Sequence, residues 1–188
     1  MVSLENEVIR IARLAYVRGL VFGVGGNISV RVGEKILITP KRACLRNVKA
    51  KELVVSDLSG NTTGKFEPSI ELPMHLAIYR NFPSANAVIH THSPFATVWS
   101  TLGTPLQSKT VEGRFALGRI PVVGHAKPGT TKLAEMICKK LKEGKAVLIQ
   151  YHGLVAVGSS LDEAFNLAET IEETTKIEMM SAILKRSF

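Results

Sequence analysis

Three histidines are the residues of this 188-residue sequence whose spacing best suggests chemistry. His90 and His92 lie one residue apart in an apolar run that is typical of a strand, so their side chains are expected on one face. His152 stands at a similar junction, between a second apolar run and Gly153. Catalytic zinc typically takes three protein ligands and keeps one coordination position open, and these three imidazoles could be the ligands. The alternative is a set of hydrogen-bonded core histidines.

The elements that must position these histidines follow from hydrophobic periodicity and turn residues. Continuous apolar runs at 87–92 and 146–150 are typical of strands buried on both faces, and alternation at 27–32 and 35–39 predicts a hairpin. We therefore expect an α/β fold, a single domain over residues 1–188 with a mixed, largely antiparallel central sheet flanked by helices. Further strands are expected at 52–57, 118–123 and 154–157, and helices at 4–18, 70–79, 94–102, 130–142 and from 160 onward.

Composition limits the classes of partner. The formal charge is +8, but the basic residues are scattered and aromatic residues make up only 6%, so nucleic-acid binding is poorly supported and an anionic small substrate fits better. No apolar run approaches the roughly 20 residues that span a bilayer, so no membrane partner is expected. The N-terminus lacks a signal pattern and the two cysteines form no CxxC pair. Together these features predict a cytoplasmic protein.

Five short motifs give the sequence a family resemblance. GNIS, LITP, EPSIE, HTH and QYHGL occur in that order and span most of the chain, at 26–29, 37–40, 67–71, 90–92 and 150–154. Together they resemble the class II aldolase and adducin superfamily, closest to its zinc-dependent fuculose-1-phosphate aldolases. The resemblance implies one Zn²⁺ on His90, His92 and His152, with Glu71 beside the metal as acid and base. It also implies a homotetramer with active sites at subunit interfaces.

The resemblance further implies a phosphate cradle, where the chain departs from the aldolase pattern. Gly26, Asn27 and Ser69 match phosphate-binding residues of the family. The aldolases usually have Thr-Gly where this chain has Lys41 and Arg42, and Ile70 replaces a second serine. We interpret Lys41 or Arg42 as a substitute phosphate ligand, with ordinary surface charge as the alternative.

A second departure concerns the proton donor to the aldehyde oxygen. His125 stands where the aldolases commonly have a tyrosine, and a histidine could do this work because its pKa lies near neutrality. An exposed loop histidine is the competing interpretation. His75, after Glu71 on the same predicted helix, is interpreted as structural.

These observations predict a metal-dependent lyase that reversibly cleaves a ketose 1-phosphate, such as L-fuculose 1-phosphate, to dihydroxyacetone phosphate and an aldehyde such as lactaldehyde. Zinc would polarise the ketone and Glu71 would move the carbon-bound proton. A methylthioribulose-1-phosphate dehydratase stays open. A pentulose-phosphate epimerase is disfavoured, because the epimerases carry aspartate at the position of Glu71. A non-catalytic adducin-like module is also disfavoured, since adducin-type domains lack the three histidines.

Overall fold

A single eight-stranded sheet is the centre of the molecule, which a computed structural model describes over residues 3–187. The strand order is β4-β3-β2-β1-β5-β10-β9-β8, and every neighbouring pair is antiparallel except β8 with β9. The fold class expected from the sequence is confirmed. The strands are β1 (Asn27–Val32), β2 (Lys35–Ile38), β3 (Val54–Asp57), β4 (Thr62–Thr63), β5 (Ala87–Thr91), β8 (Val122–Val123), β9 (Ala146–Ile149) and β10 (Gly153–Gly158).

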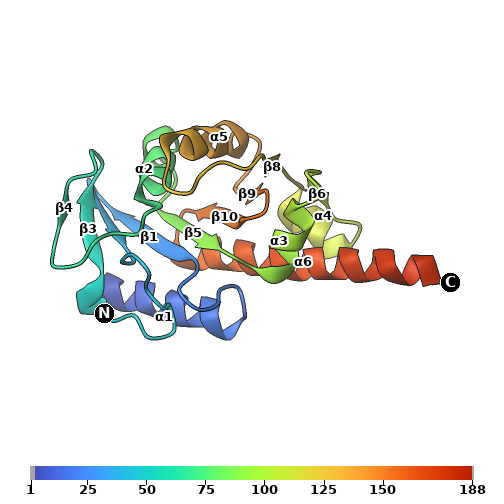
Figure 1. The fold of residues 1–188 in the computed structure, drawn as a ribbon, viewed down its shortest axis with the longest axis horizontal. Helices are drawn as coiled ribbons and strands as arrows, with labels where there is room; N and C mark the ends of the chain where they lie inside the picture. The colour runs from blue at the N-terminus through green and yellow to red at the C-terminus, as the bar shows by residue number, and fades with distance from the viewer. Residues whose placement is uncertain (1–2, 188) are drawn as a thin grey trace.

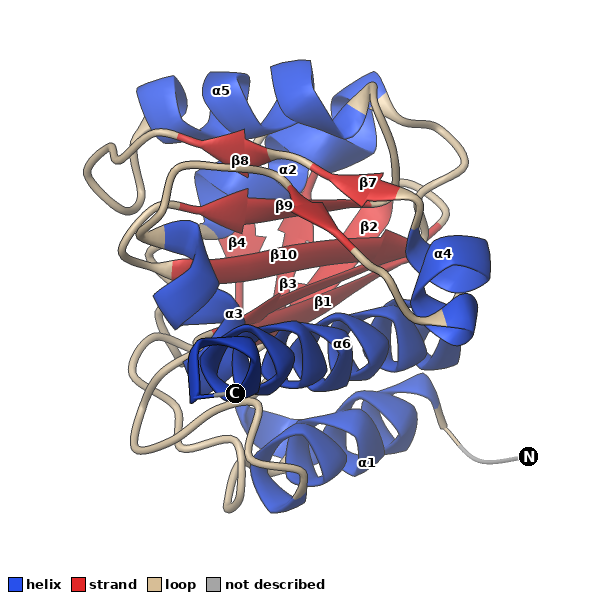
Figure 2. Ribbon diagram, turned by 90° about the vertical axis from the view of Figure 1, so that its right-hand side faces the viewer, coloured by secondary structure: helices blue, strands red, loops and turns tan. Residues whose placement is uncertain are grey.

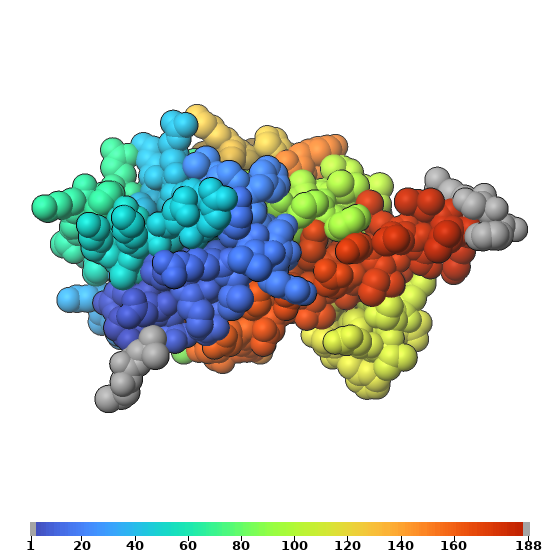
Figure 3. Space-filling model, turned by 90° about the horizontal axis from the view of Figure 1, so that it is seen from below, coloured from blue at the N-terminus to red at the C-terminus, as the bar shows by residue number. Residues whose placement is uncertain are grey.

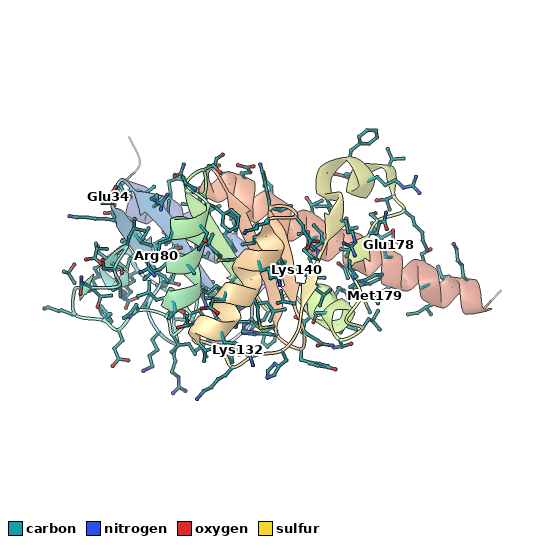
Figure 4. All side chains as sticks on the ribbon, turned by 90° about the horizontal axis from the view of Figure 1, so that it is seen from above. Glu34, Arg80, Lys132, Lys140, Glu178 and Met179 are labelled. Atoms are coloured by element: carbon teal, nitrogen blue, oxygen red, sulfur yellow. The ribbon has the colours of Figure 1, made fainter. Side chains whose placement is uncertain are left out.

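Helices cover both faces of this sheet (Figure 1; Figure 2). On one face lie α1 (Leu4–Val17) and α6 (Leu161–Ser187), and on the other lie α2 (Leu72–Asn81) and α5 (Thr131–Leu141). Seen from above, α2 and α5 run side by side across the sheet, with Arg80 and Lys140 on their outer surfaces (Figure 4). Two shorter helices, α3 (Pro94–Ser100) and the 3-10 helix η1 (Ala50–Glu52), complete the main layers.

The central strands alternate between two separate cores, because successive side chains of a strand point to opposite faces. Ile28 and Ile89 pack in the core under α1 and α6, whereas Val88 packs in the core under α2 and α5. By the same alternation Asn27, Ser29 and His90 face α2. This period-two placement decides which residues can meet in the site.

The structure differs from the sequence-based expectation around residue 121. The strand expected over 118–123 is two strands, β7 (Arg119–Ile120) and β8, separated by Pro121. Proline has no N–H to donate to a strand ladder, and only β8 joins the main sheet. β7 pairs instead with β6 (Leu106–Gln107), and these two strands flank α4 (Val111–Leu117). Neither β6 nor α4 was expected, since both are too short to show a periodicity.

Smaller differences lie at element ends. The strand expected from residue 52 begins at Val54, because Ala50–Glu52 forms η1, and β5 ends at Thr91, one residue before His92. The far end of α6 extends beyond the body of the molecule, with α4 projecting beside it (Figure 1; Figure 3). No helix within residues 3–187 is long and apolar enough to cross a membrane.

Candidate metal centre

The three sequence-predicted histidines converge at the end of β5. The Nε2 atom of His90 lies 3.1 Å from Nε2 of His92 and 3.3 Å from Nε2 of His152. Tetrahedral zinc with Zn–N bonds of about 2.0–2.1 Å would separate two ligand nitrogens by about 3.3–3.4 Å. One nitrogen of each ring lies within 4.8 Å of the others. The spacing therefore fits three imidazoles around one metal ion.

The protonation of the rings suits metal binding as well. Nδ1 of His90 donates to the carbonyl oxygen of Leu154 at 2.9 Å, which leaves Nε2 as a bare acceptor turned toward the other two rings. Burial lowers the pKa of His90 well below its ordinary value, and proximity to His152 and His92 lowers it further. Burial also lowers the pKa of His152, to about 4, and that of His92. The cluster is neutral at pH 7, the state in which histidine binds a metal.

Gly153 allows His152 to reach this cluster. A Cβ at this position would lie 2.1 Å from the carbonyl oxygen of Thr91, so only glycine fits where the turn after β9 crosses the end of β5. The preceding residue, Tyr151, takes a φ of 60°, and its backbone N–H donates to the hydroxyl of Ser100. The turn thus presses His152 against His90. The side chain of Tyr151 is largely exposed.

Glu71 stands beside the histidines at the N-cap position of α2. Its Oε2 atom lies 3.7 Å from Nε2 of His90, its side chain is 4% exposed, and neither carboxylate oxygen has a hydrogen-bond partner among the described residues. Burial raises the pKa of this carboxyl to about 7. The Gly129 amide opposes that rise in part, although it makes no hydrogen bond of normal geometry. A carboxyl that titrates near neutrality is suited to both giving and accepting a proton.

The expected phosphate-binding residues share one cleft with the histidines and Glu71. The cleft measures about 350 Å³, and its further lining residues are Val24, Gly26, Asn27, Pro40, Lys41, Arg42, Ser69, Ile70 and Pro128. Gly26 has a φ of +76°, and a Cβ there would lie 2.9 Å from the carbonyl oxygen of His90, so its backbone lies close against the end of β5. The structure therefore brings all five residues of the predicted cradle together.

The two basic residues of the cradle differ in their surroundings. Nζ of Lys41 lies 2.5 Å from Oε2 of Glu67 in an exposed ion pair. Arg42 forms no ion pair among the described residues, and its backbone takes a φ of 57°, which a residue with a side chain rarely adopts. Arg42 thus holds a strained backbone conformation at the mouth of the cleft.

His125 is the one predicted site residue that the structure does not place in the cleft. It lies exposed in the loop after β8, outside the lining residues, although it is close enough to lower the pKa of His152 slightly. Its role as proton donor stays a prediction.

Sequence reasoning missed the residues behind Asn27. His75, Ser29 and Tyr79 are all buried and form a hydrogen-bonded row that ends on the Asn27 side chain. The signal was present in the spacing. Glu71, His75 and Tyr79 recur every four residues on α2, and Asn27 and Ser29 every two residues on β1, so each set lies on one face.

Comparison with known proteins gives a consistent family assignment. The family model described as class II aldolase and adducin N-terminal domain matches residues 6–179. An L-fuculose phosphate aldolase of Methanocaldococcus jannaschii is 35% identical over 97% of this chain and 99% of its own length. A 3-oxo-tetronate 4-phosphate decarboxylase of Haemophilus influenzae is 34% identical over 92% of this chain and 85% of its own. A solved L-fuculose 1-phosphate aldolase superimposes with a TM-score of 0.91 at 31% identity, covering 98% of this chain and 89% of that one.

Proposed function

This chain belongs to the class II aldolase and adducin family, and from that premise we propose that it is a zinc-dependent lyase acting on a sugar phosphate. The reaction proposed is reversible cleavage of a ketose 1-phosphate to dihydroxyacetone phosphate and an aldehyde, with L-fuculose 1-phosphate and lactaldehyde as the first candidates. The observation that carries the proposal is the unpartnered carboxylate of Glu71, 3.7 Å from the histidine cluster at the floor of a cleft. A non-catalytic adducin-like module would have no use for that costly arrangement.

The residues present fit a resident metal ion. His90, His92 and His152 would hold it through their Nε2 atoms, and Zn²⁺ is the proposed ion because it favours nitrogen ligands and an open fourth position. When bound, it would supply Lewis-acid polarisation of the substrate carbonyl. The Leu154 carbonyl would fix the orientation of the His90 ring by accepting its Nδ1 proton.

Glu71 is the proposed proton carrier. In the condensation direction its carboxylate removes the carbon-bound proton next to the carbonyl of dihydroxyacetone phosphate, and the electron pair that is released gives an enediolate. In the cleavage direction the hydroxyl that becomes the aldehyde oxygen gives its proton to a base, the role proposed for His125, and the bond between the two carbon fragments breaks. The aldehyde leaves, and the protonated Glu71 returns its proton to the enediolate carbon. Burial raises the pKa of Glu71 to about 7, and a bound metal ion would oppose that rise, which would favour the carboxylate that accepts the carbon-bound proton.

The phosphate group would lie at the other end of the cleft. The backbone of Gly26, the amide of Asn27 and the hydroxyl of Ser69 are the proposed neutral donors, with Arg42 or Lys41 adding a charge-assisted bond. Arg42 is favoured over Lys41 because its guanidinium has no carboxylate partner among residues 3–187, whereas Lys41 is paired with Glu67.

A decarboxylase is the second candidate. Removing CO₂ from a 3-oxo acid phosphate also leaves an enediolate at the carbonyl, so the histidine cluster and Glu71 would serve that reaction unchanged. The free guanidinium of Arg42 at the cleft mouth favours it, since a substrate with both a carboxylate and a phosphate needs more positive charge than an aldolase substrate does. The dehydratase stays open, with no observation in its favour.

Product analysis separates these candidates. Zinc-loaded protein would be incubated with L-fuculose 1-phosphate, methylthioribulose 1-phosphate and 3-oxo-tetronate 4-phosphate, and dihydroxyacetone phosphate, dehydration product and CO₂ would be measured. Release of dihydroxyacetone phosphate supports the aldolase, and CO₂ supports the decarboxylase. His152→Ala is the control and should lose both metal and turnover. Protein that retains no divalent metal and turns over none of the three would instead support the adducin-like module.

A homotetramer with active sites at subunit interfaces is also part of the proposal. Apolar side chains lie exposed on α3, α4 and α6, among them Val98, Phe115 and Met180. α4 and the far end of α6 project from the body of the molecule (Figure 3). Such side chains are commonly covered by a partner. Sedimentation of the purified protein should give four times the 20.5 kDa chain mass. The cytoplasmic location stays a prediction.

A further inference from the structure

His75 is a buried titratable residue that the proposed chemistry does not use. It lies one turn after Glu71 on α2, is fully inaccessible to solvent, and burial lowers its pKa to about 3. A neutral imidazole carries one proton, so one ring nitrogen donates a hydrogen bond and the other accepts one. Both nitrogens have a partner. Nε2 lies 2.6 Å from Oδ1 of Asn27, and Nδ1 lies 2.6 Å from Oγ of Ser29.

The far end of the row decides which nitrogen of His75 carries the proton. The phenolic hydroxyl of Tyr79 is buried, and the one side-chain acceptor found for it among the described residues is Oγ of Ser29, at 2.7 Å. Tyr79 therefore donates to Ser29, because a buried O–H without an acceptor is costly. The Ser29 proton is then directed to Nδ1 of His75, which must be bare, and the ring proton must be on Nε2.

The consequence falls on Asn27, which lines the cleft. The Nε2–H group of His75 donates to the carbonyl oxygen of the Asn27 side chain, so the amide group of Asn27 turns the other way. No described residue accepts a hydrogen bond from that amide nitrogen. A side-chain amide of asparagine presents either a donor or an acceptor, depending on its flip. Here the hydrogen bond from His75, on the side away from the cleft, sets the orientation of the Asn27 amide.

We infer that His75 is a positioning residue, which acts through the row Tyr79–Ser29–His75–Asn27 to present an N–H donor of Asn27 to an anionic group in the cleft. This inference rests on the proposed function, since the anion is the substrate phosphate. The reversed row would turn the Asn27 oxygen toward the phosphate and repel it. The geometry of two matched elements makes the row possible, because Asn27 and Ser29 on β1 lie about as far apart as His75 and Tyr79 on α2.

Phosphate binding by zinc-loaded protein tests the role directly, with inorganic phosphate and dihydroxyacetone phosphate as probes in calorimetry. His75→Leu leaves Asn27 without its buried partner and should raise both dissociation constants about tenfold, the loss of one hydrogen bond to a charged group. His75→Gln offers a donor near the position of Nε2 and should recover most of the affinity. Tyr79→Phe removes only the proton that sets the direction of the row and should cost about threefold.

A destabilised protein is separated from a mispositioned amide by a matched control. Ile78→Ala removes a fully buried side chain from the same helix without touching the row, so it should lower the melting temperature but leave phosphate affinity unchanged. In turnover assays His75→Leu should raise KM, with kcat and zinc content nearly unchanged. Equal phosphate affinity in wild type and His75→Leu overturns the inference and leaves the proposed function standing.

Nitrogen NMR of the imidazole gives a readout that does not depend on activity. Wild-type His75 should show the tautomer with the proton on Nε2, and the opposite tautomer overturns the inference. Wild-type protein that binds neither probe overturns both the inference and the proposed function, whatever the tautomer.

Discussion

Glu71 and His75 lie one helical turn apart on the same face of α2 and are almost equally shielded from water. They differ in whether the protein supplies hydrogen-bond partners for their side chains. Both oxygens of Glu71 lack a hydrogen-bond partner among residues 3–187, whereas both nitrogens of His75 have one. A buried polar group without partners costs roughly 1–3 kcal/mol. At the position that faces the histidine cluster, the protein therefore leaves the carboxylate to be satisfied from within the cleft, whereas behind Asn27 it supplies the partners itself. Burial alone therefore does not distinguish a catalytic side chain from a positioning one, whereas the presence or absence of hydrogen-bond partners does.

The largest expected effect is on turnover, when Glu71 loses its ability to carry a proton. Glu71→Gln keeps the shape of the side chain but removes its ability to accept a proton, so kcat should fall by a factor of about 10²–10⁴, the usual contribution of a general base. Metal analysis should show unchanged zinc content, because the three histidines are intact. Turnover within a few-fold of wild type would contradict the role of Glu71 as proton carrier.

The same substitution, Glu71→Gln, should raise the stability of the folded protein although it lowers kcat. The pKa of Glu71 is raised to about 7 in the folded protein against 4.5 in the unfolded chain. A raised carboxyl pKa destabilises the folded state as pH rises from the unfolded value through the folded one, because ionisation is easier in the unfolded chain. Metal-free Glu71→Gln should therefore be more stable than wild type at pH 8, by roughly 3 kcal/mol.

That gain depends on pH and on the metal. It should vanish near pH 4, where the wild-type carboxyl is protonated in both states, and shrink when zinc is bound, because a cation compensates the carboxylate. Urea unfolding at several pH values measures it. A variant that is less stable than wild type at pH 8 would show that Glu71 has partners after all.

His75 should show the reverse dependence on pH. Its pKa falls from 6.5 in the unfolded chain to about 3 in the folded protein, so the unfolded chain binds the extra proton as pH drops between these values. Full stability is present above pH 6.5, and wild type should lose roughly 1.4 kcal/mol per pH unit from this residue below that. His75→Gln has no titrating group there. The stability difference between the two proteins, followed by urea unfolding from pH 6.5 to pH 4, should shrink with that slope, and a constant difference would argue against a buried neutral imidazole.

Much of this arrangement follows from periodicity. The alternation that places His90 and His92 together also places Asn27 and Ser29 on the face toward α2, and the glycine after His152 marks the close approach of β10 to the end of β5. The convergence of the three histidines was predicted from these patterns and is present in the structure. Their binding of zinc stays a prediction.

Other features depend on contacts between distant segments, which one sequence does not show. Nothing in the type of His75 distinguishes a structural histidine from one whose proton is directed by Tyr79 and Ser29. Nothing local predicts that both oxygens of Glu71 lack partners, since that depends on what surrounds α2. The segment 106–117 also has no periodic signal, because β6 and α4 are each shorter than the repeats that reveal them.

Arg42 extends the contrast to the backbone and gives the smallest expected effect. A non-glycine residue at a φ of 57° costs about 1 kcal/mol, and part of that is regained by the lower entropy of an unfolded chain without a glycine. Arg42→Gly should thus stabilise the protein by only about 0.5 kcal/mol while weakening phosphate binding about tenfold through loss of the guanidinium. Arg42→Asn is the matched control, because asparagine tolerates this conformation but carries no charge, and it should lose the same affinity without gaining flexibility. If both variants bind phosphate as wild type does, the strained backbone at residue 42 has no role in substrate binding. Glu71 would then be the one residue of this cleft at which an unfavourable local structure is explained by function.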